Sequence, residues 1–306
     1  MRVAKYTRWL AAAAVGAALA AGAWYWIQER RLYESAELLR RLPADEAVVV
    51  SIDFSTLRIA GLLQLLSGAG PAQEPEYRTF LQKTGFDYQR DLDRVLASFR
   101  PGGVYILARG RFDWNKLEAY AKSEGGTCAE RLCRMAGSQA ERRISFYPLR
   151  RDLMALAVSS DGWAATRLSE PRAPASFVPP ADPLWLYLTR GALRDPERFP
   201  EGTRLFIKAL EVSDGATLTV GPAASGFRLK MEAACRGTAE AKALHSTLEK
   251  ITQVLGVLIR RESKGLNPDD LSGVLASGKF QLEGRAVRGT WALTRKFVEG
   301  LASPPK

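Results

Sequence analysis

The longest run without a charged side chain lies near the amino terminus, and it restricts where the rest of the chain can fold. Trp9 to Ile27 is nineteen residues long, and Arg2, Lys5 and Arg8 precede it. As a helix rising about 1.5 Å per residue, this run would span roughly 28 Å, close to the thickness of the hydrocarbon core of a bilayer. The sequence therefore predicts a signal-anchor, that is, a transmembrane helix within residues 1–28.

Aromatic residues at the ends of this run favour an anchor over a cleaved export signal. Tryptophan and tyrosine concentrate at the two interfaces of a membrane, and the candidate interface anchors are Trp9, Trp24, Tyr25 and Trp26. Small residues before Ala20 and Ala23 also suit signal peptidase, so secretion after signal cleavage is the alternative. We expect the segment to stay uncleaved in the inner (cytoplasmic) membrane, single-pass, with the bulk of the chain on the extracytoplasmic side.

Prolines divide the remainder of the chain. Residues 29–42 are expected to form a juxtamembrane helix, which Pro43 ends. A first unit follows over residues 43–170, then a Pro-rich linker over residues 171–183 and a second unit over residues 184–306.

The two units share short sequence features in the same order. Pro43–Asp45 recurs as Pro180–Asp182, and each is followed by an apolar run of the kind found in buried strands. Two further matches come next in both units: Leu57-Arg58 with Leu193-Arg194, and the Arg-Gly pairs ahead of the helices expected from Asp113 and Thr238. The sequence therefore predicts an internal repeat.

Strand patterns joined by hairpin turns, with amphipathic helices between them, indicate the fold class. The clearest helix has an apolar face formed by Ala241, Leu244, Leu248, Ile251, Leu255 and Leu258, which is expected to lie on a sheet. We expect an α+β protein in which an N-terminal transmembrane helix is followed by two related units of mainly antiparallel sheet covered by helices.

Positive charge is concentrated in the second half of a chain whose net charge is +11. Residues 279–296 form one hairpin region in which Glu283 is the only acidic residue. Its basic residues make up a candidate basic surface: Lys279, Arg285, Arg288, Arg295 and Lys296. Such a surface attracts anionic lipid or cell-envelope polymers. Nucleic acid is not expected as a partner, because neither stacked aromatics nor a groove-entering helix accompanies the charge.

No cofactor is expected. Gly273–Phe280 fits the G-x-x-x-x-G-K pattern of a phosphate-binding loop, but Phe280 replaces the Ser or Thr that would coordinate magnesium. The segment is also expected to leave a helix and enter a strand, which is the reverse of that motif.

The three cysteines and the single histidine do not have the spacing of a metal site. Cys128 and Cys133 bracket a tight loop that a disulfide could close in an oxidising compartment. Cys235 is expected in a strand as a buried, unreactive side chain. His245 is expected at the edge of the apolar face of its helix.

One acidic cluster offers a candidate catalytic site. Asp87, Asp91 and Asp93 are close enough in sequence to supply the two carboxylates of a glycoside hydrolase. Arg90 lies between Asp87 and Asp91, and Arg94 follows Asp93. This mixture of charges favours the start of a helix with balanced charge over a catalytic site. We therefore assign no catalytic residue.

The same segment carries a resemblance. Gly85–Asp93, Gly110–Asp113 and Leu42–Asp45 resemble motifs of uncharacterised bacterial membrane-anchored envelope proteins, for which no activity is assigned. The resemblance implies roles in folding: a tight strand exit at Gly110, a helix cap at Asp113, and core rings at Phe86 and Phe112.

These observations lead to an expected function without a specific activity. We expect a membrane-anchored extracytoplasmic protein, not an enzyme, that binds as a scaffold module of the cell envelope. Its N-terminal helix would contact membrane lipid, and its ligand would be an envelope protein, a lipid or a wall polymer. The alternative is an envelope hydrolase with a carboxylate-based site.

Overall fold

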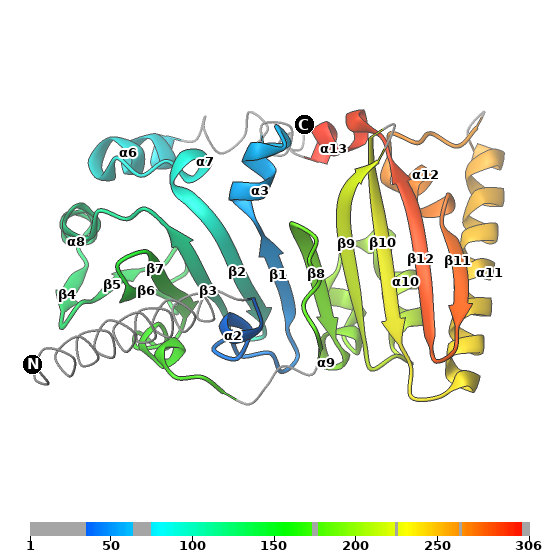
Figure 1. Cartoon of the computed structure of the whole chain (residues 1–306), viewed down its shortest axis with the longest axis horizontal. Coiled ribbons are helices and arrows are strands. Elements are labelled where there is room, and N and C mark those ends of the chain that lie inside the picture. Colours follow the sequence, from blue (N-terminus) through cyan, green and yellow to red (C-terminus); the bar gives the residue numbers. More distant parts are fainter. Residues whose placement is uncertain (1–34, 64–74, 173–176, 224–225, 263–264, 302–306) are drawn as a thin grey trace, which may run out of the picture.

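A computed structural model describes residues 35–63, 75–172, 177–223, 226–262 and 265–301 (Figure 1). The expected N-terminal helix with its four aromatic anchors therefore lies outside the described residues, as does the start of the juxtamembrane helix. The described part of that helix is α2 (Ser35–Leu39). None of the helices in these ranges is both long enough and apolar enough to cross a membrane.

The described strands form one twelve-stranded antiparallel sheet with the order β11-β12-β10-β9-β8-β1-β2-β3-β7-β6-β5-β4. The strands are β1 (Val48–Ile52), β2 (Leu92–Arg100), β3 (Gly103–Gly110), β4 (Thr127–Ala129), β5 (Leu132–Ala136), β6 (Arg143–Arg150), β7 (Leu153–Ser159), β8 (Leu184–Thr189), β9 (Gly215–Ala223), β10 (Gly226–Ala234), β11 (Lys279–Glu283) and β12 (Ala286–Leu293).

The pairing of β1 with β8 joins the two halves of the sheet. β1 is hydrogen-bonded to β2 on one side and to β8 on the other, so that Val50 lies between Ala97 and Leu186. Going outward, the first half continues β2-β3-β7-β6 and the second half continues β9-β10-β12-β11. The two halves thus have the same strand order, and the hairpin of β4 and β5 extends the first.

The expected fold class is wrong. We expected an N-terminal transmembrane helix followed by two related units of mainly antiparallel sheet, whereas the described strands form one continuous twelve-stranded sheet and no described helix could span a membrane. The physical reason is that the first strand of each unit is apolar and would otherwise leave an unpaired edge. Pairing β1 with β8 gives the backbone groups at both of these edges their hydrogen-bond partners.

Helices follow equivalent strands in the two halves. The short helices α3 (Phe54–Ile59) and α9 (Arg190–Leu193) follow β1 and β8, and the longer helices α8 (Trp114–Ser123) and α11 (Thr238–Glu262) follow β3 and β10. The remaining helices are α6 (Pro75–Thr84), α7 (Tyr88–Asp91), α10 (Arg204–Leu210), α12 (Leu271–Ala276) and α13 (Arg295–Leu301), with 3-10 turns η1 (Thr166–Ser169), η2 (Pro196–Arg198) and η3 (Glu201–Thr203).

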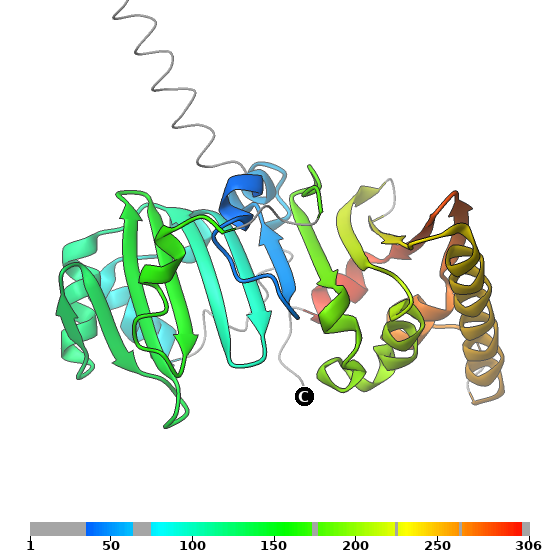
Figure 2. The ribbon, with the colours of Figure 1, turned by 90° about the horizontal axis from the view of Figure 1, so that it is seen from below.

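The sheet has two faces that are covered differently. We call the face that carries Val49 and Trp185 the front face, and the face that carries Val48 and Leu188 the back face; the cross-strand registers keep each pair on one face. In the first half α2 and η1 pack on the front, and α6 and α8 pack on the back. In the second half α10, α12 and α13 pack on the back and α11 lies beside β11. The front of β9, β10 and β12 carries none of the described helices (Figures 1 and 2).

Asp53 ties the end of β1 to its neighbours. Its carboxylate accepts hydrogen bonds from the backbone N–H of Thr56 at 2.8 Å, the hydroxyl of Ser55 at 2.7 Å and the guanidinium of Arg94 at 2.6 Å. Burial alone would raise the pKa of Asp53, but the bonds from Arg94, Thr56 and Ser55 outweigh it and hold this pKa below its ordinary value.

Removing the large side chain at the join should destabilise both halves together. Trp185 on β8 is 2% exposed, so Trp185→Ala should lower the free energy of unfolding by about 3–5 kcal/mol. Because the sheet is continuous, urea unfolding followed by circular dichroism and tryptophan fluorescence should show a single transition at lower urea. Trp163→Ala is the control, because Trp163 is 53% exposed and its ring holds only a contact with Arg134. Two separate transitions, with one unmoved by Trp185→Ala, would contradict the continuous sheet.

The contribution of Asp53 to stability should depend on pH. A carboxyl whose pKa is lower in the folded state stabilises the fold above its unfolded pKa, and this contribution is lost as the pH falls through the folded value. Wild type should therefore exceed Asp53→Asn in unfolding free energy at neutral pH, and the difference should shrink below about pH 4, the ordinary range of an aspartate. Asp45→Asn, at an exposed position, is the matched control. A difference that stays constant into acid would refute this role of Asp53.

Candidate functional site

The acidic segment and the Gly110–Asp113 segment meet at one pocket on the first half of the sheet. The pocket has a volume of about 530 Å³. Its charged lining residues are of both signs: the acids are Asp91, Asp113 and Asp152, and the bases are Arg111, Lys116 and Arg151. A pocket with several carboxylates is the geometry that the hydrolase alternative requires, so the partners of each acid decide what this pocket can do.

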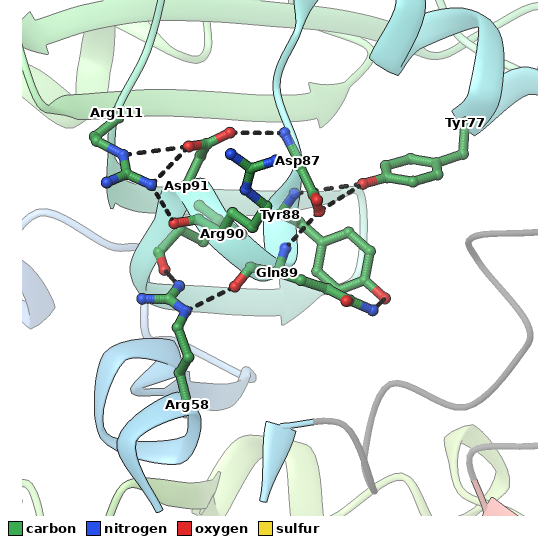
Figure 3. Close-up of polar contacts among 9 residues, drawn as sticks. Arg58, Tyr77, Asp87, Tyr88, Gln89, Arg90, Asp91 and Arg111 are labelled. Atoms are coloured by element: carbon green, nitrogen blue, oxygen red, sulfur yellow. Dashed lines mark hydrogen bonds and ion pairs between the residues drawn. The ribbon is translucent and has the colours of Figure 1, made fainter. Parts of the chain in front are cut away.

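Asp87 is held by folding contacts (Figure 3). It is the N-cap of α7, where its carboxylate accepts the backbone N–H of Gln89 at 3.0 Å, and it also accepts the Tyr77 hydroxyl at 3.3 Å. The Tyr77 hydroxyl in turn accepts the backbone N–H of Tyr88 at 3.4 Å. Burial is the main reason that the pKa of Tyr77 rises to about 12, so this hydroxyl keeps its proton and remains a donor to Asp87.

Asp91 is neutralised by Arg111. The carboxylate accepts the Arg111 guanidinium at 2.9 Å and the backbone N–H of Asp87, also at 2.9 Å (Figure 3). Arg111 also donates to the carbonyl oxygen of Arg90 at 2.6 Å. Asp93 is half-buried on β2 and does not line the pocket. The three acids therefore do not form a catalytic pair.

Two residues of the resembling motifs have the folding roles that the resemblance implies. A Cβ at Gly110 would overlap the carbonyl oxygen of Asp91, so the close approach of these two backbones requires glycine. Asp113 is the N-cap of α8 and accepts the backbone N–H of Lys116 at 3.2 Å. Phe86 and Phe112 are not core rings as expected: they stack with centroids 5.3 Å apart, but both are half-buried and line the pocket.

Arg58 ties the same segment to the helix that follows β1. Its guanidinium donates to the carbonyl oxygen of Gln89 at 2.7 Å and to that of Leu92 at 2.5 Å (Figure 3). Arg194, its partner in the predicted repeat, is exposed.

The cysteines and the histidine make contacts that stabilise the fold. Cys128 and Cys133 face each other on β4 and β5 and form a disulfide. Cys235 is buried, and burial is the main cause that raises the pKa of its thiol. His245 lies 3.5 Å from Glu249, and its Nε2 is 3.4 Å from the carbonyl oxygen of Phe280 on β11. Within the described ranges, no group of three or more metal-binding side chains is found.

The five residues of the candidate basic surface do not meet at one site. Lys279 is on β11, Arg285 lies in the turn before β12, and Arg295 and Lys296 begin α13, where Lys296 pairs with Asp269 at 3.1 Å. Arg288 on β12 pairs with Glu232 at 3.1 Å and with Glu283. The hydrogen bonds that Arg288 donates to these two carboxylates, the bond to Glu232 foremost, raise the pKa of Arg288.

Arg288 lines a groove on the uncovered front face of the second half, which we call the polar groove. Its volume is about 390 Å³. The segment Val178–Pro180 forms one wall, and the floor is made of β9, β10 and β12 side chains: Thr217, Thr219, Lys230, Glu232, Arg288 and Thr290. In the described part of the chain, the three threonine hydroxyls have no hydrogen-bond partner and the Lys230 ammonium has no ion pair.

The back face of the same strands lines a second space, which we call the apolar cavity. Its volume is about 380 Å³, and among the described side chains that line it only Thr203 and Trp291 carry an O–H or N–H group. Alternation along β9 puts Thr217 and Thr219 in the polar groove and Leu218 and Val220 in the apolar cavity. Neither space was predicted from the sequence, although the alternation of polar and apolar residues along β9 is its sequence signal.

The fold is shared with solved structures. Crystal form IV of TP0453 aligns over 88% of this chain and 98% of that chain, with a TM-score of 0.51 and 12% sequence identity. Crystal forms I and III of TP0453 cover 88% and 87% of this chain and 97% and 98% of theirs, with TM-scores of 0.49 and 0.48, again at 12% identity. At this identity the likeness to form IV shows a similar fold alone. No protein family and no curated protein matches the chain, so the resemblance to envelope proteins stays a prediction.

If Asp87 serves folding, its removal should cost stability. Asp87→Ala should lower the free energy of unfolding by about 1 kcal/mol, the usual loss when a helix N-cap is removed. Asp93→Ala is the matched control and should change stability by less than about 0.5 kcal/mol. Chemical denaturation of the two variants measures both values. If the free energy of unfolding of Asp87→Ala equals that of wild type, the capping role of this carboxylate is contradicted.

Proposed function

We propose that the protein is a non-catalytic binding module of the cell envelope. In this proposal its N-terminal segment attaches it to the extracytoplasmic side of the cytoplasmic membrane, and its polar groove binds a hydroxyl-rich, anionic wall polymer. The observation that carries the proposal is the open groove on the front face, where hydrogen-bonding groups without described partners surround an unpaired Lys230 ammonium.

The contacts of the acidic groups favour binding over hydrolysis. General acid–base chemistry needs a carboxyl that is free to exchange a proton with substrate. Asp87 caps a helix, and Asp91 is engaged by Arg111 and a backbone N–H. Asp113 is engaged as a helix cap, with the Lys116 ammonium 3.8 Å away, and Asp152 pairs with Arg109 at 3.5 Å.

The chemistry of the groove favours a polymer with hydroxyl and acidic groups. Threonine hydroxyls both donate and accept hydrogen bonds, so they suit a partner rich in the same groups. Lys230 supplies an unpaired positive charge, and the net charge of +11 attracts polyanions at long range. None of the described helices covers the front of β9, β10 and β12, so an extended chain can lie across the groove without displacing a described element (Figure 2).

The disulfide supports an extracytoplasmic location. Structural disulfides persist in oxidising compartments and are rare in the cytosol. The bond between Cys128 and Cys133 is therefore consistent with a chain that folds outside the cytoplasm.

Reversing the groove charge should weaken binding to wall material. The full-length protein should co-sediment with purified cell-wall polymer, and Lys230→Glu should raise the dissociation constant about tenfold or more. The control is Lys208→Glu on α10, an exposed position on the opposite side of the sheet with the same change in net charge.

Three outcomes decide the proposal. A loss of binding in Lys230→Glu alone supports the groove. An equal loss of affinity in both variants would show that net charge alone causes the effect, and the groove would then not be the binding site. Wild-type protein that stays in the supernatant at low salt would overturn the proposed ligand.

A further inference from the structure

We propose that the apolar cavity on the back face of the second half binds a single hydrocarbon chain, such as the acyl chain of a fatty acid or of a lipid. This site lies on the opposite face of the sheet from the polar groove and does not depend on the function proposed above. Its walls come from the back of the sheet and from the helices that cover it, including Leu218, Leu229, Phe206, Leu210 and Val274.

The size of the cavity is that of a ligand site and exceeds that of a packing defect. Close-packed protein interiors contain few voids larger than a water molecule. The volume of about 380 Å³ falls within the range of roughly 300–1,000 Å³ that is usual for small-molecule sites. An engineered cavity of about 150 Å³ lined by similar side chains admits benzene, so this one has room for a longer chain.

The chemistry of the lining selects an apolar occupant. A buried water needs two to four polar partners. Among the described lining side chains, only Thr203 and Trp291 carry an O–H or N–H group. The Thr203 hydroxyl already donates to the carbonyl oxygen of Pro200 at 2.8 Å, and the buried indole N–H of Trp291 is a single donor, fewer than a buried water needs. A sugar or nucleotide would leave its own hydrogen-bonding groups unpaired in such a lining.

The lining reaches the surface at Leu271. This residue begins α12, lines the cavity, and is 39% exposed. It lies against Gly202 in η3, because a Cβ at Gly202 would be 3.4 Å from the Leu271 side chain. A chain that enters between α12 and η3 would keep its polar end at the surface, which suits a molecule that is apolar along its length and polar at one end.

A cavity-filling variant tests the site. The full-length protein is kept in solution with cholate, which carries no linear chain, and is titrated with 12-bromododecanoic acid, whose bromine quenches tryptophan fluorescence. Trp291 lines the cavity, so wild type should show saturable quenching, and Trp291→Phe should keep the affinity with a smaller amplitude. Val220→Phe, which fills the cavity, should weaken binding at least tenfold. Partition of the probe into cholate is the same for all variants and cancels in the comparison.

A second variant keeps the test decisive if Val220→Phe does not fold. Leu271→Trp places a larger side chain at a partly exposed position, where the fold has room for it, and should also weaken binding at least tenfold. Circular dichroism establishes which variants are folded. Unsaturable quenching in wild type, or equal affinity in wild type and a folded cavity variant, would overturn the proposal.

Competition against the brominated probe separates two sources of the chain. Displacement by both dodecanoate and dodecanoyl lysophosphatidylcholine identifies an acyl-chain site that accepts lipid. Displacement by dodecanoate alone restricts the ligand to free fatty acids. Failure of both to compete would show that the probe binds elsewhere, which overturns the site. Binding to wall polymer is measured separately, so neither proposal can be mistaken for the other.

Discussion

The antiparallel pairing of β1 with β8 is the constraint on which the rest of the structure depends. It places the first strand of each half at the centre of the sheet, where its backbone groups are hydrogen-bonded on both sides. Val49 is fully buried there, and Trp185 packs against Phe177 on the same face with ring centroids 5.7 Å apart. Without this pair, two apolar strands would expose unpaired edges, which are sites of aggregation.

Because the centre is fixed in this way, the free edges lie at the two far ends of the sheet and are protected there. β4 is only three residues long and is tied to β5 by the disulfide. At the other end α11 lies beside β11, and the His245 side chain reaches the backbone of that strand. Short length, a covalent link and a covering helix are all means of limiting edge pairing.

The sequence was informative about local structure and poor on pairing between distant segments. The cap at Asp113 depends on residues that are neighbours in the chain, and so it could be predicted. The pairing of β1 with β8 joins segments more than 130 residues apart, and no local pattern encodes it. Helix α11 shows the same limit: Leu244 and Leu248 are buried as expected, whereas Leu258 is 48% exposed. A helix of 25 residues is about 37 Å long and a strand of five about 17 Å, so the end of α11 passes beyond the strand it lies against.

The back faces of the two halves are packed differently, and the apolar cavity lies in the second half. The registers from β8 through β1 and β2 to β3 place Leu188, Val48 and Val95 on one continuous face with Ala108. In the first half, aromatic side chains of α6 and the segments around Gly85 and Gly110 fill the space above this face, and Arg58 ties α3 to the same region. In the second half the matching Arg194 is exposed, and the shorter helices α10 and α12 leave a space lined by aliphatic side chains. The same sheet architecture therefore carries aromatic packing on the back of its first half and, on the back of its second half, a space with an aliphatic lining and the volume that an apolar ligand would need.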